Sequence, residues 1–316
     1  MTHIDVTEAA ELIGGSSNIL ILSHENQDGD ACGSMVALGL GLKQLGHKVD
    51  YVADRNKSGL ENLLEETSFF NGPLDEKYDL AIAVDCSTRE YLFGNSELSR
   101  AKKVLVLDHH STNTGYGDVN IVYPSSSCAA EVIYSLLKVL GCEITRQIAH
   151  AVYIAIDTDT GNFSYSNTTA YCHLIASELY ERYDDFYLID EALLMREKDV
   201  IELAKIGFGN TKFYGEGKLV VSALLYEDGF SDSINAEADI MTNTIKYIYG
   251  VVVSVTVRQT GEEAFKLSMR SADFEHDVSE FCSRFGGGGH IKAAGCTFLG
   301  TYKELEKVFA EYAQTL

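Results

Sequence analysis

Four apolar runs in the first half of the chain each end in carboxylate or imidazole side chains. In chain order, the runs lead into His24 with Asp28-Gly-Asp30, Asp85, Asp108-His109-His110, and Asp157-Thr-Asp159. Apolar runs that alternate with helical patterns predict a parallel α/β sheet, and the carboxyl ends of its strands open on one edge. The sequence therefore predicts that these polar side chains meet in one crevice.

Several carboxylates packed together repel one another unless cations neutralise them. Two divalent ions about 3.5–4 Å apart can share a bridging carboxylate and a bridging water, which then attacks phosphorus while the ions neutralise the phosphoryl oxygens. Carboxylates combined with imidazoles favour manganese-type ions over metals that prefer thiolates. The leading interpretation is a hydrolytic site that holds two divalent metal ions, with Mn²⁺ as the expected ion.

The individual motifs differ in how strongly they indicate ligands. Asp28-Gly-Asp30 alone fits an ordinary turn, and Asp85 alone fits a helix N-cap. Adjacent histidines at a strand end are rarer, and because their side chains diverge, one could bind metal while the other faces a substrate. Asp157 and Asp159 would face the same side of a strand, so alternation does not choose between them. The residues Thr-Gly-Asn-Phe that follow predict a turn directly after Asp159. This turn favours Asp159, rather than Asp157, as the residue at the edge of the sheet.

Composition limits the class of protein. The chain has 316 residues, 46% of them hydrophobic, and only two prolines, which suits two folded domains. No apolar run reaches the ~18 residues of a membrane span, and residues 1–11 lack the features of a signal peptide, so we expect a cytoplasmic protein. Seven dispersed cysteines without a CxxC pair indicate reduced thiols.

The formal net charge of −22 opposes binding of long nucleic acid, which normally requires a basic face. A short phosphate ligand remains compatible with this charge if cations and a few arginines reverse the potential locally.

We expect two α/β domains joined by a helical connector, with the catalytic cleft between the domains. The N-terminal parallel-sheet domain is assigned to residues 1–186, the connector to 187–214 and the smaller mixed-sheet domain to 215–316. In the first domain, strands are expected near 18–23, 48–53, 79–85, 103–107 and 151–157, and helices near 31–46, 58–67, 128–141 and 144–152. In the second, strands are expected at 218–226, 251–258, 264–270 and 294–299, and helices at 232–248, 275–285 and 302–315.

A second concentrated signal is the run Phe285-Gly-Gly-Gly-Gly-His290. Glycines let a ligand approach the backbone N–H groups closely, and a helix continuing from Ile291 would add its positive end. The alternative is a flexible hinge. His290 and Arg270, which ends a predicted strand, favour anion binding. Arg89 could contact a phosphate or only pair with a nearby carboxylate.

These motifs together resemble the DHH phosphoesterase superfamily, specifically the nanoRNase and pAp phosphatase group with its DHH-associated C-terminal domain. The resemblance covers nearly the whole chain. It rests on motifs in the family's order: His24-x-x-x-Asp28-Gly-Asp30, Asp85, Asp108-His-His110, Asp159-Thr-Gly-Asn-Phe163, Ser268-Met-Arg270-Ser and Gly287-Gly-Gly-His290 with Ala293-Ala-Gly295.

The resemblance implies a role for each matching residue. One manganese ion would be held by His24, Asp28 and Asp85, and the other by Asp30, Asp85, His109 and Asp159. His110 would be the catalytic residue beside the scissile phosphate, with Asp108 orienting its histidine neighbours. The substrate-binding residues would be Arg270, Gly287, Gly288, Gly289 and His290, together with Arg89.

The expected function is a manganese-dependent phosphodiesterase that converts very short oligonucleotides such as pApA to nucleoside 5′-monophosphates, and that also removes the 3′-phosphate of adenosine 3′,5′-bisphosphate. A cyclic di-AMP phosphodiesterase and a non-catalytic nucleotide sensor are the alternatives. A family II pyrophosphatase ranks lower because its second domain lacks the glycine–histidine loop. A long-strand exonuclease of the RecJ kind is opposed by the charge. The expected partner is a short nucleotide substrate, without long nucleic acid or membrane, and a homodimer is one option for the assembly.

Overall fold

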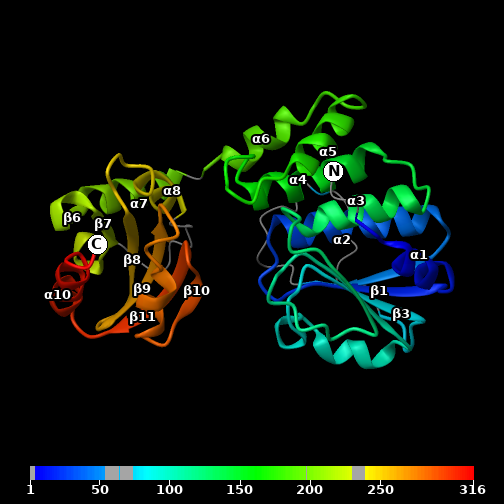
Figure 1. Ribbon diagram of the computed structural model, residues 1–316, viewed down its shortest axis with the longest axis horizontal. Helices are drawn as coiled ribbons and strands as arrows, with labels where there is room; N and C mark the ends of the chain where they lie inside the picture. Colours follow the sequence, from blue (N-terminus) through cyan, green and yellow to red (C-terminus); the bar gives the residue numbers. More distant parts are fainter. Residues whose placement is uncertain (1–3, 54–63, 65–73, 197, 230–238) are drawn as a thin grey trace. The chain divides into compact units, whose positions relative to one another are not determined.

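The computed structural model describes residues 4–53, 64, 74–196, 198–229 and 239–316. The chain divides into two compact units, Met1–Leu194 and Met195–Leu316 (Figure 1). The division falls within the segment 187–214, where α6 (Tyr187–Leu194) belongs to the first unit and α7 (Lys198–Gly209) to the second. The predicted helix at 58–67 lies outside the described residues except for Leu64.

The first unit contains the predicted parallel sheet. Its five strands are β1 (Asn18–Leu22), β2 (Lys48–Val52), β3 (Leu80–Val84), β4 (Val104–Asp108) and β5 (Val119–Val122). All pairings are parallel and the order is β2-β1-β3-β4-β5. The sequence analysis missed β5, a short edge strand with one buried residue. The chain order reverses between β1 and β3, and ligands bind outside the carboxyl ends of strands at such a switch point.

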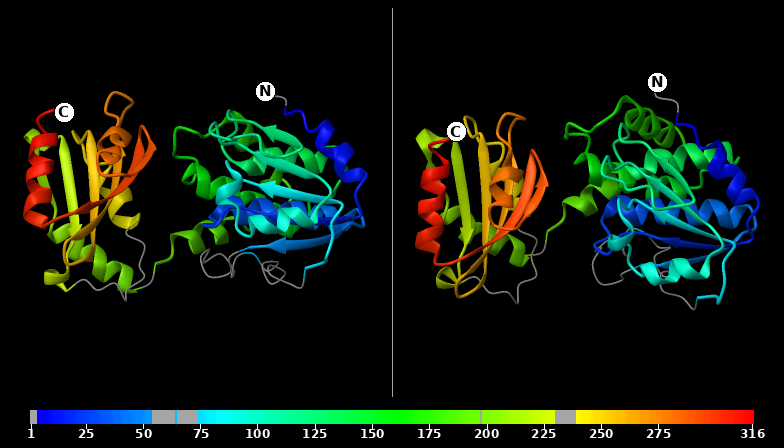
Figure 2. Two further views of the ribbon diagram at one scale, coloured as in Figure 1. Left: turned by 90° about the horizontal axis from the view of Figure 1, so that it is seen from below. Right: turned by 60° about the horizontal axis from the view of Figure 1, so that its bottom comes forward.

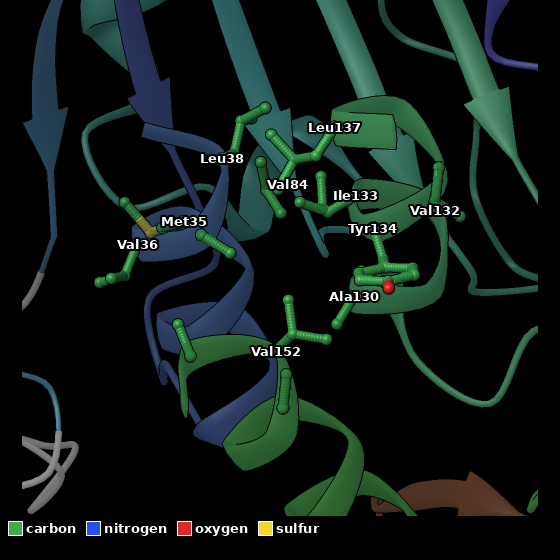
Figure 3. Close-up of a cluster of buried hydrophobic side chains, with 14 of the residues drawn as sticks. Met35, Val36, Leu38, Val84, Ala130, Val132, Ile133, Tyr134, Leu137 and Val152 are labelled. Atoms are coloured by element: carbon green, nitrogen blue, oxygen red, sulfur yellow. The ribbon is translucent and has the colours of Figure 1, made fainter. Parts of the chain in front are cut away.

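Side chains alternate between the two faces of this sheet. Ile19 and Ile21 of β1 face the larger core, and Leu20 and Leu22 face the opposite one. The larger core is formed with the helices α1 (Thr7–Gly14), α2 (Gly29–Gln44), α3 (Ala129–Val139), α4 (Arg146–Thr160) and α5 (Ala170–Tyr180). Figure 3 shows side chains of α2, α3 and α4 packed beside Val84 of β3. On the opposite face, Leu92 directly follows the short 3₁₀-helix Arg89–Tyr91, and Leu98 lies in the 3₁₀-helix Asn95–Arg100.

The predicted strand at 151–157 is wrong, because these residues continue α4 as helix. Every residue from Ala151 to Asp157 is buried. A helix that is apolar all round shows no amphipathic period, so a short stretch of it cannot be told from a buried strand by its pattern. The carboxylates after this run therefore lie at the end of a helix rather than of a strand.

The second unit contains a mixed sheet, as predicted, but it has six strands, and the two short edge strands were not expected. Its strands are β6 (Lys212–Tyr214), β7 (Leu219–Leu224), β8 (Val253–Gly261), β9 (Ala264–Ser271), β10 (Gly288–His290) and β11 (Ala293–Leu299), in the order β10-β11-β9-β8-β7-β6. Among the described strands of this sheet, only β7 and β8 pair in parallel. Figure 2 shows the sheet between helices, with α10 (Tyr302–Tyr312) on one side.

The helices of this unit cover both faces of the sheet. Phe281 of α9 (Val278–Ser283) and Phe309 of α10 pack in one core. Leu203 of α7 and Met241 of α8 (Asp239–Ile245) pack with Leu224 on the other face. The expected helix at 232–248 is described only from 239 onward.

The chain does not continue as a helix from Ile291, and the strand expected at 294–299 is present there as β11. His290 ends β10, and the chain turns at Ile291 and Lys292 into the antiparallel strand β11. The β-branched and small residues that follow the glycines pair with β9, and this pairing overrides any local helical preference. The positive end of a helix is therefore not available to an anion there.

Two further expectations concern the whole chain. None of the seven cysteines forms a disulfide, and six of them are buried, as expected for reduced structural thiols. Among the described residues, every helix is too short or too polar to cross a membrane.

The close packing of α2 on α4 yields a test of stability. A Cβ atom at Gly33 would lie 2.3 Å from the Ala151 carbonyl oxygen, whereas one at Gly14 would meet nothing within 4 Å. Gly33→Ala should therefore lower the free energy of unfolding by about 1–3 kcal/mol through overpacking. Gly14→Ala, the matched control, should be neutral or slightly stabilising. Urea denaturation followed by circular dichroism compares them, and equal midpoints would contradict the packing argument.

Candidate metal centre

The carboxyl ends of β1, β3 and β4 lie side by side and carry the polar residues singled out in the sequence. The Ser23 hydroxyl donates a 2.7 Å hydrogen bond to the Val84 carbonyl oxygen, which joins the ends of β1 and β3. The Asp85 backbone N–H donates to the Leu107 carbonyl oxygen at 2.9 Å, which joins the ends of β3 and β4. His24, Asp85 and the Asp108-His109-His110 segment consequently start from one edge of the sheet.

A first group of ligand-type side chains consists of His24, Asp28 and Asp85. His24 Nε2 lies 3.8 Å from Asp28 Oδ1 and 3.6 Å from Asp85 Oδ2. Asp28 is also the N-cap of α2, because its carboxylate accepts from the Ala31 N–H. The capping and ligand interpretations of this aspartate are therefore compatible.

A second group consists of Asp30, His109 and Asp159. His109 Nε2 lies 3.8 Å from Asp30 Oδ2 and 3.7 Å from Asp159 Oδ2. It also lies 3.6 Å from Oδ1 of Asp85, whose other oxygen faces His24. The Asp85 carboxylate thus lies between the two groups, as a carboxylate shared by two ions would.

Asp85 provides the test of whether these residues suit a cation. The residue is 2% exposed, and Oδ1 has no hydrogen-bond partner among the described residues. Its φ of 51° places a non-glycine residue in the left-handed region, which costs free energy. An unsatisfied buried carboxylate is unfavourable unless a cation compensates it. The donor set of oxygens and imidazole nitrogens therefore fits divalent ions.

Asp108 supports the two adjacent histidines. Its fully buried carboxylate accepts hydrogen bonds from the backbone N–H of His109 at 2.7 Å, from Nδ1 of His110 at 2.7 Å and from the Asn113 amide at 2.6 Å. The Nδ1 atom of His109 lies 3.4 Å from the Ser126 carbonyl oxygen, which leaves Nε2 free to bind a metal. The sequence analysis did not identify Asn113 and Ser126, because their roles depend on long-range contacts.

Asp30 is held by the beginning of α3. Its carboxylate accepts from the Ala129 N–H at 2.6 Å, the Ala130 N–H at 3.1 Å and the Ser34 hydroxyl at 3.0 Å. The first N–H groups of a helix have no partner within the helix and favour a negative charge. Several hydroxyl-bearing residues precede α3 in the sequence. The carboxylate that accepts from the first N–H groups of α3, however, belongs to Asp30 of α2.

Asp157 and Asp159 are separated by the geometry of α4. Two residues apart on a helix, side chains point about 200° apart rather than to one side. Asp159 faces His109, whereas Asp157 is buried elsewhere, and burial and the charge of Asp190 raise the pKa of Asp157 to about 6. The choice of Asp159 agrees with this arrangement, although the reasoning from a strand was wrong.

Burial and the crowding of charge change the proton affinities of these side chains. Burial, together with the charges of Asp85 and Asp159, raises the pKa of Asp30 well above its usual range. Burial also raises the pKa of Asp159 to about 7. For His24, burial disfavours the imidazolium, but hydrogen bonds to Asp28 and Asp85 prevail and raise its pKa to about 10. The site thus retains protons where it lacks other cations.

The predicted substrate-binding residues lie in two places. Arg89 is exposed on the 3₁₀-helix Arg89–Tyr91, next to the segment that pairs with His24. Arg270 lies in β9 and His290 at the end of β10, and both pair with Ala293 of β11. A Cβ atom at Gly287 would lie 2.2 Å from the Gly295 carbonyl oxygen, and Gly289 has a φ of 146°, so both positions require glycine for the fold itself. Gly288 faces open space.

Comparisons with known proteins agree with this architecture. The DHH family, N-terminal domain, matches residues 18–156, and the DHHA1 domain matches residues 216–316. A protein of Thermus thermophilus named bifunctional oligoribonuclease and PAP phosphatase NrnA is 32% identical over 93% of this chain and 88% of its own length.

Two solved structures share the fold. An exopolyphosphatase-related protein from Bacteroides fragilis matches with a TM-score of 0.87 and 22% identity, covering 98% of this chain and 95% of its own. RecJ from Thermus thermophilus in complex with Mn²⁺ matches with a TM-score of 0.51 and 15% identity, covering 98% of this chain and 54% of its own.

Metal binding should release protons. A metal ion needs deprotonated ligands, whereas the raised pKa values of His24, near 10, and Asp159, near 7, keep protons on the metal-free site at neutral pH. We therefore expect Mn²⁺ affinity to fall as the pH is lowered from 8 to 6. Titration calorimetry in buffers of different ionisation enthalpy measures the protons released.

The matched control for this titration is Asp157→Asn, which removes a buried carboxyl that faces away from the centre. It should bind Mn²⁺ like the wild type, whereas His24→Gln should release fewer protons and bind more weakly. Mn²⁺ binding without proton release would show that the ion does not occupy this group of residues.

Proposed function

The chain belongs to the DHH family of phosphoesterases, and on this basis we propose that it is a manganese-dependent phosphodiesterase that hydrolyses very short oligonucleotides to nucleoside 5′-monophosphates. The resemblance found in its motifs is confirmed by the two domain matches and the relative at 32% identity. We include removal of the 3′-phosphate from adenosine 3′,5′-bisphosphate, because that relative is named for both activities.

The observation that carries this proposal is the position of Asp85 between the two ligand groups. We assign His24, Asp28 and Asp85 to one ion, and Asp30, Asp85, His109 and Asp159 to the other. Bound there, two divalent ions would supply an activated water and neutralise charge on the phosphoryl oxygens. The carboxylates in turn fix where the ions can lie, because Asp30 is anchored to α3 and Asp85 to β4.

His110 is assigned to the scissile phosphate. Its Nδ1 atom is hydrogen-bonded to Asp108, so Nε2 is the ring nitrogen left for a substrate. This hydrogen bond and the nearby carboxylates raise the pKa of His110 to about 9, which favours the cationic form of the ring. A fixed cation that donates a hydrogen bond to a phosphoryl oxygen stabilises charge that develops in the transition state.

The second unit supplies groups for the nucleotide. We assign residues 215–316 to substrate binding, with Arg270 and His290 as the phosphate contacts and Gly288 as the place of close backbone approach. The net charge of −22 favours a short substrate, because a long polyanion would be repelled by the rest of the chain beyond these few contacts.

A panel of substrates with Mn²⁺ tests the proposed function. It contains pApA, longer RNA, cyclic di-AMP, adenosine 3′,5′-bisphosphate and pyrophosphate, with products resolved by chromatography. We expect pApA to be converted to AMP in preference to longer RNA. Preference for cyclic di-AMP would favour a cyclic di-AMP phosphodiesterase instead. Turnover of pyrophosphate alone would mean that the second unit was misinterpreted. No turnover of any substrate would favour a nucleotide sensor.

The role of His110 is tested by His110→Ala. Loss of a preorganised donor to the transition state should lower kcat about 10²–10³-fold. Mn²⁺ affinity should change little, because this histidine is not among the proposed ligands. His47→Ala is the control, since His47 bonds to the Ser16 carbonyl oxygen at the other end of the sheet. Equal loss of metal binding and activity in His110→Ala would instead make His110 a ligand.

A further inference from the structure

The connection between β9 and α9 presents an exposed aromatic ring beside the proposed phosphate contacts. Phe274 is 68% exposed, and it follows Arg270 by four positions in the chain. Both ends of the connection are tied to the turn between β10 and β11. The Ser271 N–H donates to the Lys292 carbonyl oxygen and the Val278 N–H to the Ile291 carbonyl oxygen, each at 3.0 Å. Phe274 therefore belongs to the same corner of the unit as His290.

The turn around Phe274 is fixed by Asp273. Its Oδ1 atom accepts from the Glu275 N–H at 2.9 Å and the His276 N–H at 3.1 Å, and it lies 2.9 Å from His276 Nδ1. The Ser271 hydroxyl donates to the Asp273 carbonyl oxygen at 2.9 Å. These bonds hold the backbone on both sides of Phe274, so its exposure is built into the turn.

One cation lies directly beside this ring, on the β10–β11 turn. Lys292 Nζ lies 5.0 Å from the centroid of the Phe274 ring. Arg270 and His290 lie on the two strands that flank β11, each paired with Ala293, the residue after Lys292. An exposed ring at the same corner of the sheet as three side chains able to bind a phosphate matches the two chemical parts of a nucleotide.

We propose that Phe274 is a stacking platform for the nucleobase of a nucleotide whose phosphate is held by Arg270 and His290. The inference deepens the proposed function and rests on it, since it names what this corner of the second unit recognises. Stacking on an aromatic ring is tolerant of base identity, because every base has a π-face. The platform thus selects nucleotides over other phosphate esters without selecting one base.

The test compares the affinities of AMP and ribose 5-phosphate for the full chain with Mn²⁺, measured by calorimetry. The two ligands share the phosphate and the sugar, so their difference reports the base. In the wild type, AMP should bind about tenfold more tightly, as expected for one stacked base. Phe274→Ala should abolish this difference by weakening AMP alone, and Phe274→Tyr should retain it.

The matched control is Phe213→Ala, because Phe213 is a similarly exposed ring, 55% exposed, on β6 at the opposite edge of the same sheet. It should leave both affinities unchanged. The inference is overturned if AMP fails to bind, if the wild type binds both ligands equally, or if Phe274→Ala preserves the difference. These affinities are measured without turnover, so they test the stacking platform separately from the proposed function. If Phe274→Ala abolishes the difference but the wild type hydrolyses nothing in the substrate panel, the platform stands and the phosphodiesterase proposal is contradicted.

Discussion

The Asp85 carboxylate is buried at the end of β3, in a left-handed conformation, with one oxygen near His24 and the other near His109. Other carboxylates surround it, and burial together with the neighbouring negative charges raises the pKa of Asp30 and Asp159. Such an arrangement opposes folding unless protons or metal cations compensate the charge. The rest of the first unit can be understood as the scaffold that holds these groups together.

That scaffold combines strand ends with helix ends. The strands β1, β3 and β4 deliver His24, Asp85 and the two adjacent histidines, while α2 and α4 deliver the remaining aspartates. The helices can approach closely because Gly29 and Gly33 of α2 leave room for Thr158 and Ala151 of α4. The α3 N-terminus then fixes Asp30. The packing of these apolar surfaces therefore holds the charged groups at fixed positions. A site that binds ions at defined places requires such fixed ligands.

The sequence was sufficient where a signal was local. Apolar runs followed by Asp or His predicted the parallel sheet, and the motifs predicted the family, both of which are confirmed. The sequence was insufficient where a structure depends on contacts between residues that are far apart in the chain. The buried α4 looked like a strand, β5 was too short to recognise, and the glycine run leads into a hairpin because β11 pairs with β9. The bonds from α3 to Asp30 span about a hundred positions, and no local pattern reports them.

Electron paramagnetic resonance of the Mn²⁺-loaded protein tests most directly whether Asp85 is shared between two ions. Two ions about 3.5–4 Å apart with a common carboxylate are magnetically coupled. The account predicts two bound Mn²⁺ with the spectrum of a coupled pair, and the spectrum of isolated ions for Asp85→Asn. A wild type that binds a single ion, or two ions without coupling, would contradict it.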